Sequence, residues 1–153
     1  MLDNKGFDLW ADGYEMYGID FSERMLEIAK DKMPLAKLVQ YDFSKGFPEE
    51  LENIQFDYII STYAMHHLED EDKIKFINKL KNQLSNDGEI IFGDIAFETR
   101  ELLELCKAKY DNYWDDEERY FVFDELKEFF PKEYISFSTI SHCAGIIQLR
   151  KSL

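Results

Sequence analysis

The sequence has few of the features that would place the protein in a membrane or outside the cell. None of its apolar runs approaches the roughly 20 residues that a membrane-spanning helix needs. Its N-terminus, MLDNKGFDLW, has neither the basic start nor the apolar stretch of a signal peptide. Cys106 and Cys143 are the only cysteines and form no CxxC pair, which is typical of a reducing compartment. We therefore expect a cytoplasmic protein.

Positive charge is also scarce. The chain has 18 lysines and arginines against 32 aspartates and glutamates, which gives a formal net charge of −14. Such a surface repels phosphate groups, so nucleic acid and membrane surfaces are disfavoured as partners, whereas a small molecule or a protein fits better. Acidity by itself mainly promotes solubility and specifies no partner.

A third shortage concerns glycine at the position where a nucleotide-binding protein needs it. The stretch YGIDFSERML (17–26) has the pattern of a strand, an acid and a capped helix, which is typical of the second βα unit of such a fold. Only 16 residues precede this stretch, and they contain no GxGxxG. Gly6, Gly13 and Gly18 lie far apart. We therefore expect that the first strand and its glycine loop are missing.

The remaining chain alternates between strand and helix patterns. The expected strands are 16–20, 36–43, 56–64 and 89–97, and the expected helices are 21–33, 69–84, 99–110 and 124–130. Ser22 can cap the first helix, and SNDG is expected to end the second one. Segment 56–64 is apolar on both sides, which favours a buried parallel strand. Two further strands joined by HCA close the chain as an antiparallel hairpin.

This alternation predicts an α/β fold with a mostly parallel sheet, whose ligands bind outside the carboxyl ends of the strands. Asp20 stands at such an end and can accept hydrogen bonds from a ribose diol, although it can equally cap the following helix. Asp42 can accept from an adenine amino group beside Phe43, or can simply be a polar residue leaving the core. Ser61 and Thr62 can offer backbone carbonyls to an amine.

His66 and His67 suggest either metal ligands or a general base. Adjacent side chains on a forming helix point in different directions, and no cysteine or carboxylate stands at ligand spacing. We therefore expect no metal at these histidines. One histidine is expected to pack in the core, while the other faces the ligand cleft.

Taken in order, these segments resemble the class I S-adenosylmethionine-dependent methyltransferases of the small bacterial type. YGIDFSERMLEIAK resembles the second motif of that family, LVQYDF the third and FDYIISTYAMHHLED the fourth. The resemblance implies a Rossmann-like methyltransferase sheet, mostly parallel with a C-terminal antiparallel hairpin. It also implies S-adenosylmethionine as the cofactor and methyl transfer to a small-molecule or protein acceptor.

The resemblance further implies roles for particular residues. The cofactor-binding residues would be Asp20 at the ribose, Phe21 and Met25 lining that pocket, Asp42 at the adenine amine, Phe43 beside the ring, and Ser61 near the methionine amino group. The acceptor would meet Trp10, Tyr14, Tyr63 and Trp114, and His66 or His67 would be the catalytic base.

The chain departs from this family at its start. Residues 1–15 resemble the family's N-terminal leader and run directly into an incomplete α/β domain at 16–153, so the simplest account is an internal deletion of the first unit. Strands 17–20 and 57–62 would then lose the neighbour between them, and would pair with each other or with a second chain in a homodimer.

Three functions are compatible with these features. The first is a methyltransferase whose cofactor binding is weakened by the missing motif. The second is a non-enzymatic binding or assembly module on the same scaffold. The third is a nicotinamide-dependent oxidoreductase, which is disfavoured because it also needs a glycine loop.

Overall fold

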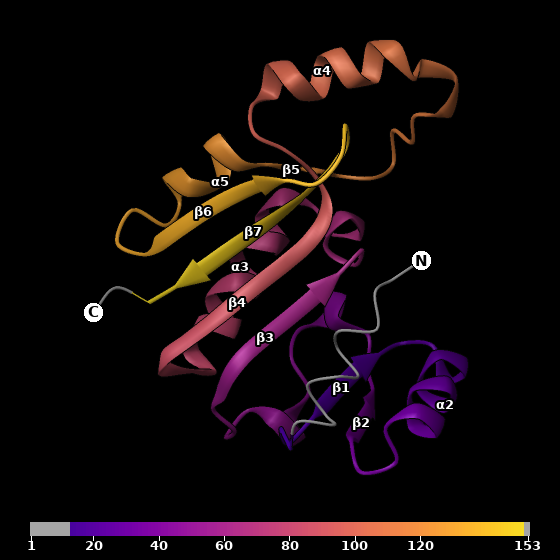
Figure 1. The fold of residues 1–153 in the computed structure, drawn as a ribbon, viewed down its shortest axis with the longest axis vertical. Coiled ribbons are helices and arrows are strands. Elements are labelled where there is room, and N and C mark those ends of the chain that lie inside the picture. Colours follow the sequence, from indigo (N-terminus) through magenta and orange to yellow (C-terminus); the bar gives the residue numbers. More distant parts are fainter. Residues whose placement is uncertain (1–12, 152–153) are drawn as a thin grey trace. The chain divides into compact units, whose positions relative to one another are not determined.

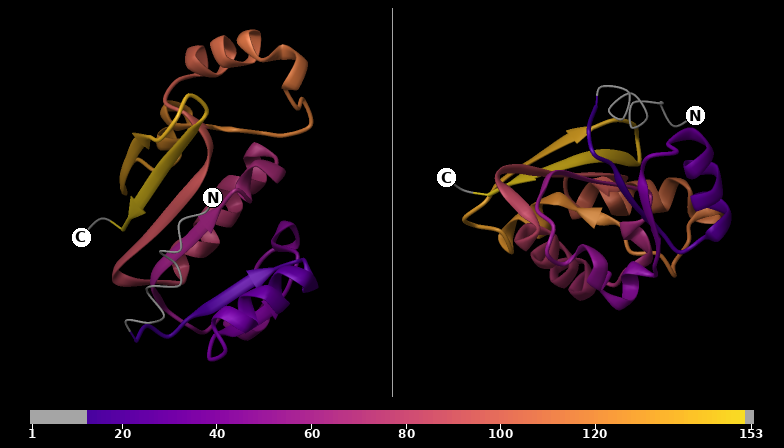
Figure 2. Two further views of the ribbon diagram at one scale, coloured as in Figure 1. Left: turned by 45° about the vertical axis from the view of Figure 1, so that its right-hand side comes forward. Right: turned by 90° about the horizontal axis from the view of Figure 1, so that it is seen from below.

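The computed structural model describes residues 13–151, and the chain divides between Glu52 and Asn53 into two units, each with its own sheet (Figures 1 and 2). This boundary lies inside the expected domain at 16–153, and most of the expected leader at 1–15 lies outside the described residues. The division into leader and domain therefore stays a prediction. No helix within residues 13–151 is long and apolar enough to cross a membrane.

The first unit is a small parallel βαβ arrangement. Strand β1 (Tyr17–Asp20) pairs in parallel with β2 (Lys37–Gln40), and helix α2 (Glu23–Lys32) connects them. The register places Asp20 opposite Gln40, so both strands end at the same edge of the sheet. Two short 3₁₀ helices follow, η1 (Phe43–Lys45) and η2 (Glu49–Leu51).

Helix α2 begins at the residue that the sequence predicts. Ser22 Oγ accepts a hydrogen bond from the backbone N–H of Met25 at 3.3 Å, as an N-cap should. None of the helix side chains is buried, however, and Met25 and Ile28 are 52% and 37% exposed. The apolar face of this helix is therefore only partly covered within residues 13–151, since Leu26 and Ala29 are half-buried.

The second unit contains a five-stranded mixed sheet. Its strands are β3 (Phe56–Thr62), β4 (Leu84–Phe97), β5 (Phe121–Val122), β6 (Tyr134–Thr139) and β7 (Ala144–Arg150). Strands β3 and β5 pair in parallel with β4, whereas β7 pairs antiparallel with both β4 and β6. The predicted α/β fold with a closing antiparallel hairpin is thus confirmed.

The helices of the second unit also follow the predicted order. They are η3 (Met65–His67), α3 (Asp70–Asn82), α4 (Arg100–Lys109), η4 (Asp111–Tyr113) and α5 (Phe123–Glu128). Helix α3 packs against β4 and buries Ile77 and Leu80. Helix α3 ends at Asn82, just before SNDG, as predicted. The next strand begins at Leu84 rather than at the expected residue 89: Leu84 is opposite Phe56, whose N–H donates to the Gln83 carbonyl at 2.7 Å. The pairing register with β3 shifts here, so residues 85–88 lie between the two paired positions Leu84 and Glu89.

Strand β3 is parallel, as predicted, but the expectation that it is buried is wrong. Its residues Tyr58 and Ile60 are 51% and 49% exposed. Within the described part of the chain β3 pairs only with β4, and β1 pairs only with β2. Each of these two strands therefore has one edge that no other strand of residues 13–151 pairs with.

Gly145 lets β6 and β7 approach each other closely, and we expect Gly145→Ala to lower the free energy of unfolding by about 1–3 kcal/mol. An added Cβ would lie 2.3 Å and 2.6 Å from ring atoms of Phe137, which is itself stacked on Phe123. Gly93→Ala is the matched control, because its Cβ would meet only Thr62 at 3.7 Å. Urea unfolding of both variants checks the prediction, which fails if they are equally stable.

Candidate functional site

Asp20 stands at the carboxyl edge of the β1–β2 sheet and uses one of its two carboxylate oxygens locally. Oδ1 accepts from the backbone N–H of Ser22 at 2.8 Å, and the Tyr41 N–H donates to the Asp20 carbonyl at 3.0 Å. No hydrogen bond from residues 13–151 reaches Oδ2. The side chain therefore orders the start of α2 and still has an oxygen available to a ligand.

Asp42 follows β2, and its carboxylate is largely engaged within its own turn. Oδ1 accepts from the N–H and the hydroxyl of Ser44 at 3.1 Å and 2.6 Å, and Oδ2 lies 3.5 Å from Lys45 Nζ. The Ser44 hydroxyl lowers the pKa of Asp42. Asp42 therefore caps η1, and a ligand would have to share these oxygens.

Apolar side chains beside Asp20 remain exposed. Phe21 and Met25 are 66% and 52% exposed, and Phe43 is half-buried. Ligand sites combine such apolar surface with a few polar groups that fix orientation. The first unit has both features that the adenosine portion of S-adenosylmethionine needs. Asp20 has an available carboxylate oxygen, and exposed apolar side chains lie at the start of α2.

Ser61 and Tyr63 lie at the carboxyl end of β3 in the second unit. Ser61 is opposite Phe92, and the Tyr63 N–H donates to the Gly93 carbonyl at 2.8 Å. Tyr63 has a φ of 49°, the only positive φ of a non-glycine residue in the described chain. Such a conformation costs about 1–3 kcal/mol and is enriched at ligand sites, which makes this strand end a candidate site.

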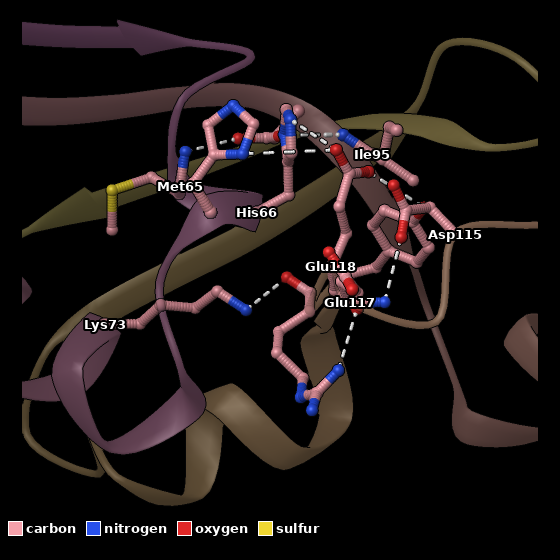
Figure 3. A network of polar contacts seen from close by, with 11 residues as sticks. Met65, His66, Lys73, Ile95, Asp115, Glu117 and Glu118 are labelled. Atoms are coloured by element: carbon pink, nitrogen blue, oxygen red, sulfur yellow. Dashed lines mark hydrogen bonds and ion pairs between the residues drawn. The ribbon is translucent and has the colours of Figure 1, made fainter.

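Asp94 of β4 holds His66 in a fixed orientation (Figure 3). Asp94 Oδ1 lies 2.6 Å from His66 Nδ1 and accepts from the Ile95 N–H at 2.8 Å, while Oδ2 accepts from the Met65 N–H at 2.9 Å. Asp94 and His66 are both buried, whereas the side chain of His67 is 57% exposed. One histidine therefore packs, as the sequence predicts, and the other faces solvent.

Glu118 approaches the same histidines from the segment before β5. Its Oε1 lies 3.6 Å from His66 Nε2 and 4.0 Å from His67 Nδ1, and its Oε2 accepts from the Tyr120 hydroxyl at 2.9 Å. Burial raises the pKa of Tyr120, so the phenol keeps the proton that it donates. The fold thus supplies the carboxylate that the sequence around the two histidines lacks.

The buried Lys73 anchors this segment to α3. Its Nζ donates to the backbone carbonyl of Arg119 and to Asp70 Oδ1, the latter at 3.0 Å, and the Arg119 N–H donates to the His66 carbonyl at 3.0 Å. Burial lowers the pKa of Lys73. These two hydrogen bonds to the backbone of Arg119 position the neighbouring Glu118 beside the histidines.

The predicted acceptor-facing residues have different surroundings. Trp114 packs at 5.0 Å, edge to face, on Tyr120 and lies 6.4 Å from Phe97, so much of its ring is used in packing. Tyr14 is 48% exposed. Trp10 lies outside the described residues.

Sequence reasoning missed Asp94 and Glu118. Asp94 had a usable signal, since it is an acid in the middle of an otherwise apolar predicted strand, within EIIFGDIAF. Glu118 had none, because DNYWDDEERYFVF contains several acids and nothing distinguishes this one.

Fold and site together define a Rossmann-like α/β domain with acids at successive strand ends. Residues 6–88 match the sequence profile of the methyltransferase domain family, and the chain belongs to that family. It is 33% identical over 148 residues to an uncharacterized methyltransferase of Oceanobacillus iheyensis, covering 91% of this chain and 68% of that protein. This family uses S-adenosylmethionine, so the oxidoreductase alternative has no support.

Two further similarities agree with this assignment. An uncharacterized methyltransferase of Anoxybacillus flavithermus is 41% identical over 102 residues, which cover 65% of this chain but only 47% of that protein. The chain thus spans from about half to two thirds of these relatives. The magnesium protoporphyrin IX methyltransferase of Synechocystis PCC 6803, solved with S-adenosylhomocysteine, has the same fold: TM-score 0.71, 16% identity, 95% of this chain and 68% of that one.

Proposed function

We propose that the protein transfers a methyl group from S-adenosylmethionine to a small-molecule or protein acceptor. The observation that carries this proposal is the state of Asp20, a strand-end carboxylate with one oxygen available and exposed Phe21 beside it. A ribose diol needs such an acceptor, and an adenosine needs such an apolar neighbour. Membership of the methyltransferase domain family supports the reaction class.

In this proposal each unit has its own expected cofactor contacts. The contacts from the first unit are Asp20 at the ribose, Phe21 and Met25 beside it, and Asp42 with Phe43 at the adenine. Ser61 of the second unit meets the methionine amino group, at the end of a strand whose next residues include the strained Tyr63.

The bound cofactor supplies a methyl group already activated on a sulfonium, so the protein mainly has to align the acceptor. Tyr14, Tyr63 and Trp114, with Trp10, are the proposed acceptor-facing residues. If the acceptor must lose a proton, His66 or His67 takes it. His66 suits this role because Asp94 fixes its ring through Nδ1 at 2.6 Å, which leaves Nε2 to receive the proton.

The absence of a glycine-rich first motif from the sequence favours a second candidate, a binding or assembly module that keeps only the scaffold. The open edges of β1 and β3 within residues 13–151 support it, because such edges are templates for pairing with another chain. We propose self-association as a homodimer in either case. We also propose a cytoplasmic location and an acceptor that is neither nucleic acid nor a membrane. The net charge of −14 supports this choice of acceptor, because it repels phosphate groups.

Asp20→Ala is expected to weaken the binding of S-adenosylhomocysteine about tenfold or more. The variant loses a charge-assisted hydrogen bond, which contributes on the order of 1.5–3 kcal/mol. Asp31→Ala is the matched control, because Asp31 is an exposed acid near the end of α2, away from the carboxyl end of β1. Isothermal titration calorimetry measures both variants.

Two results would contradict the proposal in different ways. Equal affinity of the Asp20 and Asp31 variants would remove Asp20 from the site. If the unaltered chain bound neither S-adenosylmethionine nor S-adenosylhomocysteine, a binding or assembly module would be favoured over a methyltransferase.

A further inference from the structure

Three ligand atoms of metal-binding type converge at the end of η3 (Figure 3). They belong to His66, His67 and Glu118, and all lie within 4.8 Å of one another. The Glu118 oxygen is 3.6 Å from His66 Nε2 and 4.0 Å from His67 Nδ1. Ligands at 2.0–2.2 Å from a tetrahedral metal lie roughly 3.4 Å apart, so only a small closure is needed. The exposed His67 side chain can supply it by rotating.

Asp94 prepares His66 as a ligand. Both Asp94 oxygens accept backbone N–H groups, from Met65 at 2.9 Å and from Ile95 at 2.8 Å, which favours an ionised carboxylate that can only accept. His66 Nδ1, 2.6 Å away, therefore carries the ring proton, and Nε2 presents its lone pair toward Glu118. A carboxylate behind a ligating histidine is the usual second partner in metal sites.

Glu118 lacks a positively charged partner in the described chain. Tyr120 donates to Oε2 at 2.9 Å, which orients the carboxylate and leaves Oε1 facing the histidines. The two nearby cations are committed elsewhere: Lys73 binds Asp70 at 3.0 Å, and Arg119 binds Glu69 at 3.1 Å. At 3.6 Å, Glu118 Oε1 and His66 Nε2 are also too far apart for a good hydrogen bond. The two atoms therefore face each other without a hydrogen bond between them.

We propose that His66 Nε2, His67 Nδ1 and Glu118 bind a divalent transition-metal cation of the Zn²⁺ type. Two imidazoles and one carboxylate form a donor set that such ions accept, and three protein ligands leave a further position for water or an oxygen of an acceptor. The metal would lower the pKa of that oxygen, taking the place of a free histidine base. Metal binding itself requires neither the cofactor nor methyl transfer.

This proposal reverses the expectation from the sequence alone. That expectation depended on the lack of a cysteine or carboxylate at ligand spacing from the two histidines along the chain. The fold brings Glu118 to them through the ties of Lys73 and Arg119 to the same segment.

The experiment uses the full chain without a histidine tag, stripped of metal by a chelator and titrated with Zn²⁺ against a coloured competitor. We expect one Zn²⁺ per chain, and binding at least tenfold weaker in His67→Ala and in Glu118→Gln. His142→Ala and Glu117→Gln are the matched controls, since both residues are exposed and lie outside the cluster. Both controls should keep the affinity of the unaltered protein.

Substituting Co²⁺ gives a second readout, because its visible absorption reports coordination by nitrogen and oxygen. His67 is exposed, so its replacement should leave the circular dichroism spectrum unchanged. Less than stoichiometric Zn²⁺ in the unaltered chain would overturn the proposal. Equal Zn²⁺ affinities of the ligand variants and the two control variants would also overturn it. Loss of metal with retained S-adenosylhomocysteine binding would support it and leave the proposed methyl transfer unaffected.

Discussion

Asp94→Ala is expected to lower the free energy of unfolding by about 3–5 kcal/mol, because it removes one partner of a buried polar network. Asp94 is 2% exposed. It accepts hydrogen bonds from the N–H groups of Met65 and Ile95 and lies 2.6 Å from His66 Nδ1. Alanine would leave two backbone donors and an imidazole N–H buried without an acceptor.

Chemical unfolding of the full chain measures this loss, with Asp57→Ala as the control. Asp57 is an exposed acid that accepts a hydrogen bond from the Ser85 hydroxyl at 2.9 Å, so its replacement should change stability by no more than about 0.5 kcal/mol. Asp94→Asn keeps an acceptor oxygen, so its free energy of unfolding is expected to lie between those of Asp94→Ala and Asp57→Ala. Equal stability of the Asp94 and Asp57 alanine variants would show that the network contributes little.

Local signals along the chain predict much of this fold. The N-cap at Ser22, the acidic first turn of α3 at Asp70–Asp72 and the short connection before β7 each depend on neighbouring residues, and each appears where it is predicted. The strand-end positions of Asp20 and Asp42 follow in the same way, since a strand followed by a capped helix fixes them.

Contacts between distant segments are what the sequence could not supply. Glu118 reaches His66 only because Lys73 and Arg119 hold its segment beside α3 and η3. No periodicity encodes such a contact. The polar SNDG stretch lies within β4 for a similar reason, because Leu84 before it and Glu89 after it both pair with β3.

Strand β3 shows the same limit in its burial. A sequence that is apolar on both sides of a strand shows only that the strand can be buried. Whether it is buried depends on neighbours at both edges and on both faces. Within residues 13–151 β3 has a paired neighbour on one edge only, and Tyr58 and Ile60 stay about half exposed. Strand β3 therefore has more apolar surface than residues 13–151 cover.

That excess leads to the last prediction: the 153-residue chain is expected to self-associate rather than remain an ordinary monomer. Strands β1 and β3 each have one edge that no other strand of residues 13–151 pairs with, and exposed apolar residues belong to the same parts of the chain, among them Phe21 at 66% and Ile60 at 49%. Covering each large apolar side chain contributes roughly 1.5–3 kcal/mol. A domain is stable by only about 5–15 kcal/mol, so a few such contacts decide whether association is favourable.

Light scattering at several concentrations measures the association, and we expect the mass of two chains to dominate as concentration rises. Ile60→Lys places a charge on the open strand, which should oppose pairing there and shift the chain toward monomer. Leu105→Lys is the matched control, because Leu105 is 60% exposed on α4 and belongs to no open strand edge. A monomer at every concentration, with a sharp thermal transition, would contradict association. It would mean that β3 and β1 find their missing partners within one chain, since unpaired strand edges beside exposed apolar side chains do not otherwise persist in a stable protein.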